Sequence, residues 1–243
     1  MEYRVEKVLK NKMVTENIYE MTVSGKFEGK PGQFYMLRAW EDEPLLSRPI
    51  SIYSIDKDSI TFLYAVVGKG TEILKDLKEG SDIKLLGPSG NGFPIEKIKG
   101  KVAIVTGGIG IAPMYYVCEM LHEINMDVDL YSGFRDSVHT VDKFEKIIKY
   151  IHISTETGIV GHKGYVTEIF NPENYDMVLC CGPEIMMKNV TSMCEEKDVP
   201  IYVSTEKKMA CGVGACLVCT CKTKSGNKRS CKDGPVFLGE ELY

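Results

Sequence analysis

Several features common in other protein classes are missing from this chain of 243 residues. Its net charge is −4 and its Lys and Arg residues are scattered, so it lacks the basic stripe of a nucleic-acid-binding protein. Residues 1–12 have only isolated apolar side chains between charges, which excludes the continuous apolar core of a secretory signal. The longest weakly charged stretch, residues 102–118, is shorter than the ~20 apolar residues that span a bilayer. We therefore expect a soluble, cytoplasmic protein with no nucleic-acid or membrane partner.

Cysteine is absent from the chain before Cys118 and concentrated near its end. The total of nine is odd, which argues against a complete disulfide framework. Five of the nine lie close together: Cys211, Cys216, Cys219, Cys221 and Cys231. Dense cysteines in a reducing compartment more often bind metal than pair with one another. The four histidines show no metal-ligand spacing, so the cysteines are the candidate ligands.

The first hundred residues read as β-rich, with alternating or β-branched runs between Gly, Pro, Asn and Asp turns. Six strands are predicted, at residues 3–9, 18–23, 33–38, 51–55, 60–67 and 82–86. A helix is predicted at residues 71–77. Short strands at this spacing indicate a small antiparallel β-barrel.

After Lys101 the pattern changes to strands that alternate with helices. The predicted strands are residues 102–106, 128–132, 151–154, 177–181 and 201–205, and the predicted helices are residues 112–124, 143–148, 166–170 and 185–196. Such alternation indicates βαβ crossovers and a doubly wound parallel sheet. The tail is rich in Gly and Cys without periodicity. We therefore predict a barrel domain at residues 1–99, an α/β domain at residues 100–205 and a small cofactor-held lobe at residues 206–243.

The cysteine spacing is the strongest signal. Cys211, Cys216 and Cys219 follow C-x4-C-x2-C, with Cys231 further on, which is the spacing of plant-type [2Fe–2S] proteins. Structural zinc is the alternative, but zinc sites favour repeated short pairs such as C-x2-C. Cys221 lies two residues after Cys219 and is the rival ligand.

A second signal is the segment Arg48-Pro49-Ile50-Ser51. Arg48 offers planar, bidentate donors to a phosphate, and Ser51 offers a hydroxyl on the same extended segment. Gly70 and Thr71 stand at a predicted helix start, where free N–H groups bind a pyrophosphate. Taken alone, an Arg-Pro pair in a barrel is more often structural. Its interpretation as a phosphate site depends on the neighbouring motif at Gly70 and Thr71.

The third signal follows the first parallel strand, where Gly107, Gly108 and Gly110 form a turn before a helix. Glycines there let a dinucleotide approach the backbone, although the motif is not G-x-G-x-x-G and a turn without ligand is the alternative. Cys181-Gly182-Pro183 ends the fourth parallel strand. Because open α/β sheets bind ligands at the carboxyl ends of their strands, Cys181 is placed to border a nicotinamide ring.

These motifs, in this order, resemble the ferredoxin-NADP reductase superfamily across nearly the whole chain. The stretch from Glu206 to Cys216, with Cys231-Lys232-Asp233-Gly234-Pro235, is similar to the electron-transfer subunits of class B dihydroorotate dehydrogenases. The resemblance implies FAD in the barrel, NAD in the α/β domain and a [2Fe–2S] cluster in the tail. It also implies a separate FMN-containing catalytic subunit, which forms a heterotetramer with this one and oxidises dihydroorotate in pyrimidine biosynthesis.

By position, the resemblance implies that FAD is bound by three groups of residues: Arg48, Pro49, Ile50 and Ser51; Leu63, Tyr64 and Ala65; and Gly70 and Thr71. Arg135 could hold a 2′-phosphate whereas Asp136 would repel one, and the resemblance favours NAD over NADP. No acid/base constellation is visible, as expected if hydride moves between nicotinamide and flavin. Two alternatives remain: a reductase subunit of a sulfide dehydrogenase, hydrogenase or ferredoxin:NADP complex, and a non-enzymatic redox sensor or zinc-held adaptor.

Overall fold

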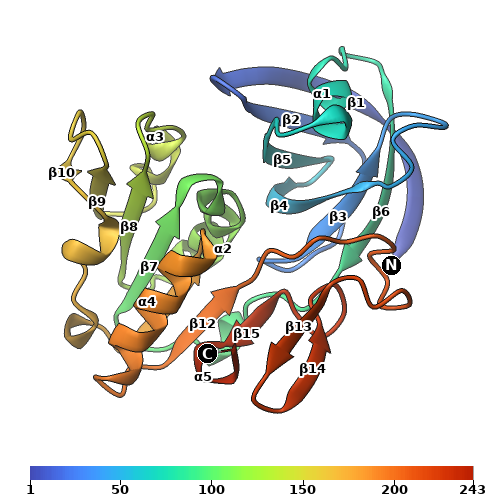
Figure 1. The fold of residues 1–243 in the computed structure, drawn as a ribbon. Helices are drawn as coiled ribbons and strands as arrows, with labels where there is room; N and C mark the ends of the chain where they lie inside the picture. Colours follow the sequence, from blue (N-terminus) through green and yellow to red (C-terminus); the bar gives the residue numbers. More distant parts are fainter. Residues whose placement is uncertain (243) are drawn as a thin grey trace.

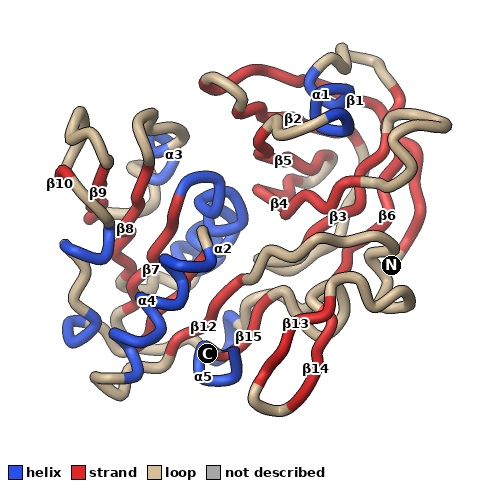
Figure 2. Tube along the Cα trace, viewed as in Figure 1, coloured by secondary structure: helices blue, strands red, loops and turns tan. Residues whose placement is uncertain are grey.

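The computed structural model describes residues 1–242, which form three regions (Figure 1). A β-barrel occupies the N-terminal part, drawn in blue to cyan, and an α/β region follows, drawn from green to orange. The C-terminal segment, in orange-red and red, leaves the α/β region, runs past the barrel and then returns to the sheet from which it came. Figure 2 shows that most of the helices lie in the α/β region.

The barrel is closed and antiparallel, with the strand order β1-β2-β5-β4-β3-β6. Its strands are β1 (Glu2–Thr15), β2 (Ile18–Ser24), β3 (Phe34–Arg38), β4 (Arg48–Asp56), β5 (Ser59–Ala65) and β6 (Asp82–Ser89). The short helix α1 (Lys69–Lys75) follows β5. Pairing of β1 with β6 closes the barrel, so that it has no open strand edge. The predicted small antiparallel barrel is confirmed.

Strand β1 is longer than the predicted residues 3–9. Its second half pairs with β2, with Lys12 opposite Glu20, and the turn between them holds Asn17 at φ 62°. Asn tolerates this left-handed conformation better than most residues. The polar run of residues 10–12 breaks the apolar alternation, so the extension of the strand depends on pairing with β2 and not on a local pattern.

The α/β region contains a seven-stranded sheet with the order β10-β9-β8-β7-β11-β12-β15. Its strands are β7 (Val102–Gly107), β8 (Val128–Phe134), β9 (Tyr150–Thr155), β10 (His162–Lys163), β11 (Met177–Cys181), β12 (Ile201–Ser204) and β15 (Val236–Leu238). Its helices are α2 (Ile111–Glu123), α3 (Val141–Phe144), α4 (Glu184–Glu195) and α5 (Gly239–Leu242). Short 3-10 helices are η1 (Ile95–Lys97), η2 (Gly108–Gly110), η3 (Val166–Glu168) and η4 (Pro172–Asn174).

The strand order reverses between β7 and β11: the chain proceeds to one side through β8 and β9, and to the other through β12. All of these neighbours are parallel, which confirms the predicted doubly wound sheet. In such sheets the crevice outside the carboxyl ends of the strands at the reversal point is the ligand site. Here that crevice lies beyond Gly107 and Cys181.

Two predicted helices differ in extent from the structure. The helix predicted at residues 143–148 is wrong in its bounds: α3 spans only Val141–Phe144, and a turn follows in which the N–H groups of Ile147 and Ile148 both bond to the Phe144 carbonyl. The chain must reverse there to reach β9 at Tyr150, so the helix stops after one turn. The helix predicted at residues 166–170 is the single 3-10 turn η3.

The C-terminal segment forms a hairpin from β13 (Thr220–Thr223) and β14 (Gly226–Arg229) and then joins the large sheet. Strand β15 pairs antiparallel with β12, with Phe237 opposite Val203. The end of the chain is thus anchored to the α/β sheet, while the cysteine-rich part lies between the two ends of this segment.

The barrel and the α/β region are held together by an aromatic contact. Tyr53 of β4 stacks on Tyr115 of α2, with ring centroids 4.6 Å apart, and Lys143 lies 4.8 Å above the Tyr53 ring. Lys143 also forms an ion pair with Glu20 of β2. Among residues 1–242, no helix is both long and apolar enough to cross a membrane.

Candidate functional site

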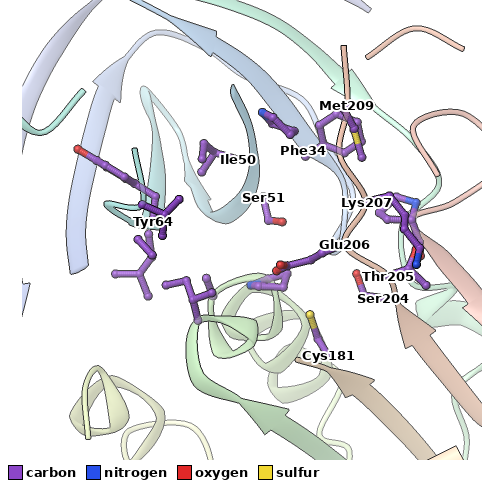
Figure 3. A pocket seen from close by; sticks show the side chains of 18 residues that line it. Phe34, Ile50, Ser51, Tyr64, Cys181, Ser204, Thr205, Glu206, Lys207 and Met209 are labelled. Carbon is purple, nitrogen blue, oxygen red and sulfur yellow. The ribbon is translucent and has the colours of Figure 1, made fainter. Parts of the chain in front are cut away.

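A pocket opens where the barrel, the α/β region and the C-terminal segment meet (Figure 3). The barrel wall contains six of the residues predicted to bind a cofactor: Pro49, Ile50, Ser51, Leu63, Tyr64 and Ala65. Cys181, from the end of β11, lies on the opposite side. The fold thus brings residues from distant strands, predicted separately, to one place.

Arg48, the first residue of β4, precedes Pro49 of the pocket wall, and its guanidinium packs against the start of α1. A β-carbon built on Gly70 would come within 2.5 Å of the Arg48 Nε, so the guanidinium occupies the space that any larger residue at position 70 would fill. The Arg48 guanidinium also lies 5.5 Å from the Trp40 ring. Glycine at position 70 therefore positions the arginine.

Thr71 has a role that the sequence did not suggest. Its hydroxyl accepts hydrogen bonds from the N–H groups of Val67 (2.9 Å) and Gly68 (3.2 Å) and donates one to the Gly68 carbonyl (2.9 Å). The side chain is therefore engaged in shaping the turn before α1. Any contact with a ligand would come from the backbone at this position.

The glycine turn after β7 lies against the end of β11. Gly107, Gly108, Gly110, Gly182 and Pro183 line a second hollow that adjoins the first pocket at Ile109 and Glu206. A β-carbon on Gly110 would meet the carbonyl oxygen of Cys181, so only glycine permits this approach of η2 to β11. The two predicted motifs therefore form one surface.

A third hollow continues outward from Gly107, Gly108 and Pro183. Its walls include Arg135 at the end of β8 and Glu156 just after β9. Arg135 is exposed and pairs with Asp136 at 3.6 Å. The two hollows together extend along the carboxyl ends of β7, β8 and β9, an elongated shape that suits a dinucleotide.

The four cysteines of the predicted cluster motif lie in two pairs. The thiol of Cys211 is within hydrogen-bond reach of Cys216, and the thiol of Cys231 is within reach of Cys219. In the described part of the chain, no three His, Cys, Asp or Glu side chains converge as ligands of a single metal ion do. Two pairs of thiols suit two metal ions with two ligands each, as in a [2Fe–2S] cluster.

Backbone N–H groups point at the sulfur atoms. Val213 and Cys216 donate to Cys211 Sγ at 3.4 and 3.5 Å, and Cys231 donates to Cys219 Sγ at 3.4 Å. Burial acts to raise the pKa of Cys211, but these backbone donors outweigh it and lower the pKa to about 6. Such donors stabilise thiolate sulfurs, so the loop fits an anionic cluster.

Arg229 and Asp233 hold this loop in place. The Arg229 guanidinium makes two hydrogen bonds to the Asp233 carboxylate, at 3.0 and 3.1 Å, and donates to the Gly214 carbonyl at 3.1 Å. Hydrogen bonding to Arg229 lowers the pKa of Asp233 to about 2, so this carboxylate is ionised. The pair connects the hairpin to the cysteine loop.

Cys221, the rival ligand, has a different environment. It lies on β13, is buried, and its thiol donates to the Lys228 carbonyl at 3.5 Å across the hairpin. Burial raises the pKa of this thiol. Cys221 therefore has the surroundings of a packed, protonated thiol.

Glu206 is a pocket residue that the sequence analysis missed. It projects into the first pocket between Ser51 and Cys181 (Figure 3). The Glu206 side chain is accessible to solvent through the open pocket. The protein around the carboxyl still removes part of its hydration, and this burial raises its pKa. A signal for it exists in the sequence, because Glu206 follows β12 and so lies at the carboxyl end of a strand next to β11.

Comparison with known proteins identifies the family. The sequence is 62% identical over 240 residues to the dihydroorotate dehydrogenase B (NAD(+)) electron transfer subunit of Clostridium acetobutylicum, covering 99% of this chain and 97% of that protein. The chain belongs to this family. The electron transfer subunit of Clostridium perfringens is 51% identical, with 100% and 98% covered.

Other comparisons agree with membership in the dihydroorotate dehydrogenase B electron transfer subunits. Residues 206–243 match the family model for the iron-sulfur cluster binding domain of dihydroorotate dehydrogenase B. A solved NADH-dependent reduced ferredoxin-NADP oxidoreductase superposes with a TM-score of 0.88 at 30% identity, covering 98% of this chain and 89% of that one. The predicted family, the fold and the function of an NAD-linked electron-transfer subunit are confirmed.

Proposed function

We propose that this chain relays electrons between NAD(H) and an FMN-containing dihydroorotate dehydrogenase catalytic subunit, through FAD and a [2Fe–2S] cluster, in cytoplasmic pyrimidine biosynthesis. The two subunits would form a heterotetramer. In the division that we propose, residues 1–99 bind FAD, residues 100–205 bind NAD and residues 206–243 bind the cluster. The relatives' name, which specifies NAD(+) and electron transfer, supports this proposal.

One observation carries the proposal: a single pocket is walled by all three regions. Its residues come from β3, β4 and β5 of the barrel, from η2, α2 and β11 of the α/β region, and from the segment that leads to the cysteines. A flavin in this pocket would lie next to the nicotinamide site on one side and the cysteine loop on the other. This adjacency is what a relay of redox groups requires.

The FAD site in this proposal is formed by Arg48–Ser51, Leu63–Ala65 and the turn at Gly70 and Thr71. Arg48 would contribute its guanidinium to the phosphates, since bidentate donors suit phosphate oxygens. Ser51 faces the pocket, so its hydroxyl could form a hydrogen bond with a ligand bound there. Leu63, Tyr64 and Ala65 provide a largely apolar wall for a ring system.

For NAD, the proposed residues are Gly107, Gly108, Gly110, Cys181, Gly182 and Pro183. The glycines let a pyrophosphate approach the backbone, and Cys181 lies between this surface and the first pocket. Burial raises the pKa of the Cys181 thiol, so it stays protonated and borders the ring as a neutral group. When bound, FAD would exchange hydride with nicotinamide and single electrons with the cluster.

The proposed cluster ligands are Cys211, Cys216, Cys219 and Cys231. Their arrangement in two pairs and the N–H donors to sulfur support this assignment. Cys221 is left out because its thiol bonds to the Lys228 carbonyl.

The test is to isolate the full chain anaerobically, after expression with iron and riboflavin available, and to measure its flavin, iron and acid-labile sulfide. We expect FAD, a [2Fe–2S] absorption spectrum, and oxidation of NADH with an artificial acceptor. Dihydroorotate oxidation should appear only after the catalytic subunit is added. Colourless, zinc-loaded protein would refute the proposal and favour a zinc-held adaptor.

A second candidate is a reductase subunit of a ferredoxin:NADP-type complex. The likeness to the NADH-dependent reduced ferredoxin-NADP oxidoreductase, at 30% identity, is the observation that favours it. The native partner distinguishes the two: a subunit that oxidises dihydroorotate supports the first function, and a ferredoxin-oxidising subunit supports the second.

A further inference from the structure

Both faces of strand β3 are buried. Strands of antiparallel sheets commonly have one face on the core and the other toward solvent, so the second face of β3 must be covered by another segment. Its residues Tyr35 and Leu37 point into the barrel core. Phe34 and Met36, which alternate with them, are in a separate apolar cluster with Cys219 and Cys231. Because side chains alternate along a strand, β3 presents one face to the barrel and the other to the cysteine loop.

Met209 joins this apolar cluster from the C-terminal segment, two residues before Cys211. Met209 and Phe34 also line the flavin pocket, where Figure 3 shows them together at one end. Met36 differs: it packs under Gly212, where a β-carbon would come within 2.6 Å of Met36 Cγ, and it is not part of the pocket wall. Phe34 and Met209 are thus shared between the pocket and the surroundings of the cysteines.

The two cysteine pairs face different surroundings. Cys219 and Cys231 are each 2% exposed and touch the apolar cluster. Cys216 is exposed and Cys211 is half-buried. The buried pair is therefore on the side of the flavin pocket, and the other pair is on the side of solvent or a partner.

We propose that Phe34 and Met209 form the contact through which electrons pass between the flavin pocket and the half of the cluster held by Cys219 and Cys231. The inference rests on the proposed function. In each transfer the reduced flavin loses one electron and one ferric ion of the cluster becomes ferrous. The two side chains make no bond and carry no proton; they fill the space between donor and acceptor.

Close packing is the physical basis. Protein interiors are packed as densely as organic crystals, so two apolar side chains in contact leave no void between them. The thioether of methionine is polarizable and makes favourable contacts with aromatic rings. Truncating Met209 to alanine would remove these contacts, and surrounding atoms relax only partly into such a cavity. The gap would then weaken the coupling between the two redox groups.

The experiment uses the full chain loaded with FAD and cluster, mixed rapidly and anaerobically with NADH, with flavin and cluster absorbance followed separately. In Met209→Ala we expect flavin reduction at the wild-type rate and cluster reduction severalfold slower. Met209→Leu, which keeps most of the apolar volume, should recover most of the rate. Met193→Ala is the matched control, because Met193 packs against a separate apolar cluster of the α/β region and does not line the pocket, and it should reduce its cluster at the wild-type rate.

Two further readouts separate a lost contact from a damaged site. The midpoint potentials of flavin and cluster, and the electron paramagnetic resonance spectrum of the reduced cluster, should be those of the wild type. Slow cluster reduction that is accounted for by a shifted potential would overturn the inference, as would an unchanged rate in Met209→Ala. If that variant loses its cluster, Phe34→Leu is measured in its place under the same criteria.

Failure of this inference differs from failure of the proposed function. Wild-type protein without flavin or acid-labile sulfide would refute the function itself. Wild-type protein that holds both and reduces its cluster, with no slowing in Met209→Ala or Phe34→Leu, would refute only the role of this contact.

Discussion

Gly70 lies directly against the guanidinium of Arg48, and a β-carbon at position 70 would come within 2.5 Å of the Arg48 Nε and 2.6 Å of Cζ. The two residues belong to different elements, Arg48 to β4 and Gly70 to α1. With the Trp40 ring 5.5 Å away, the guanidinium is held between an indole and a glycine. The position of the arginine thus depends on a missing side chain.

Gly70→Ala should therefore weaken FAD binding by displacing the Arg48 guanidinium. We expect an increase in the dissociation constant of at least about tenfold, since a hydrogen bond to a charged group contributes about 1.5–3 kcal/mol. Flavin retained after gel filtration and titration of FAD into apoprotein measure this effect. Gly68→Ala is the control, because φ at Gly68 is 167° and a β-carbon there meets nothing within 4 Å. Equal retention in both variants would contradict the prediction.

The cysteine assignments can be tested by paired substitutions. Cys216→Ser should abolish or strongly reduce cluster content, because it removes a thiolate from a proposed ligand set. Cys221→Ser should keep the wild-type content, since the Cys221 thiol bonds to the Lys228 carbonyl in the hairpin. Iron and acid-labile sulfide per chain, with the visible spectrum, give the answer. Loss of the cluster in Cys221→Ser with retention in Cys216→Ser would reverse the assignment.

Glu119 of α2 predicts a pH dependence of stability at the contact between the two regions. Burial, together with repulsion from Asp56, raises its pKa from 4.5 to about 7, although Tyr115 acts in the opposite direction. The unfolded chain ionises this carboxyl above pH 4.5, whereas the folded chain resists ionisation until about pH 7. The wild type therefore loses stability relative to Glu119→Gln as the pH rises between these values.

At pH 8 the apoprotein of Glu119→Gln should accordingly be more stable than the wild type by about 1–2 kcal/mol, a figure discounted for partial solvent exposure. At pH 4 the two should have similar stability. Denaturant unfolding at both pH values measures the difference. Glu196→Gln, at an exposed position just after α4 and not among the charges that act on Glu119, is the control and should show no such pH dependence. An equal gain at both pH values would show that ionisation is not the cause.

Selection between NAD and NADP should depend on carboxylates near Arg135. Glu156 lines the same hollow as Arg135, and Asp136 pairs with that arginine at 3.6 Å. Asp136→Asn combined with Glu156→Gln should raise the ratio of kcat/KM for NADPH over NADH by about tenfold, because roughly 1–2 kcal/mol of repulsion toward a 2′-phosphate is removed.

The control for this experiment is Glu168→Gln. Glu168 accepts from His162 at 2.8 Å and is not part of the wall of the hollow. Its ratio should stay at the wild-type value. An unchanged ratio in the double variant would place the discrimination elsewhere in the hollow.

Much of the fold and part of the site could be predicted from the amino-acid sequence because their signals are local. Alternation of apolar residues marked the barrel strands, and the apolar run ending at Thr106 marked the first parallel strand. The spacing from Cys211 to Cys219 indicated a cluster, because thiolates so close in the chain must surround one centre. Arg48 and Gly110 were found in the same way, from short motifs next to predicted strands.

Other features depended on contacts between residues far apart in the chain. The only local signal for Glu206 is its place just after β12, and its entry into the pocket follows from β12 lying beside β11. Phe34 and Met209 are 175 residues apart in the sequence. They meet only because the C-terminal segment runs back along β3. Strand β15 likewise pairs with β12 although the whole cysteine loop lies between them in the sequence. Local sequence determines which elements form, whereas packing between distant elements decides which side chains share a pocket.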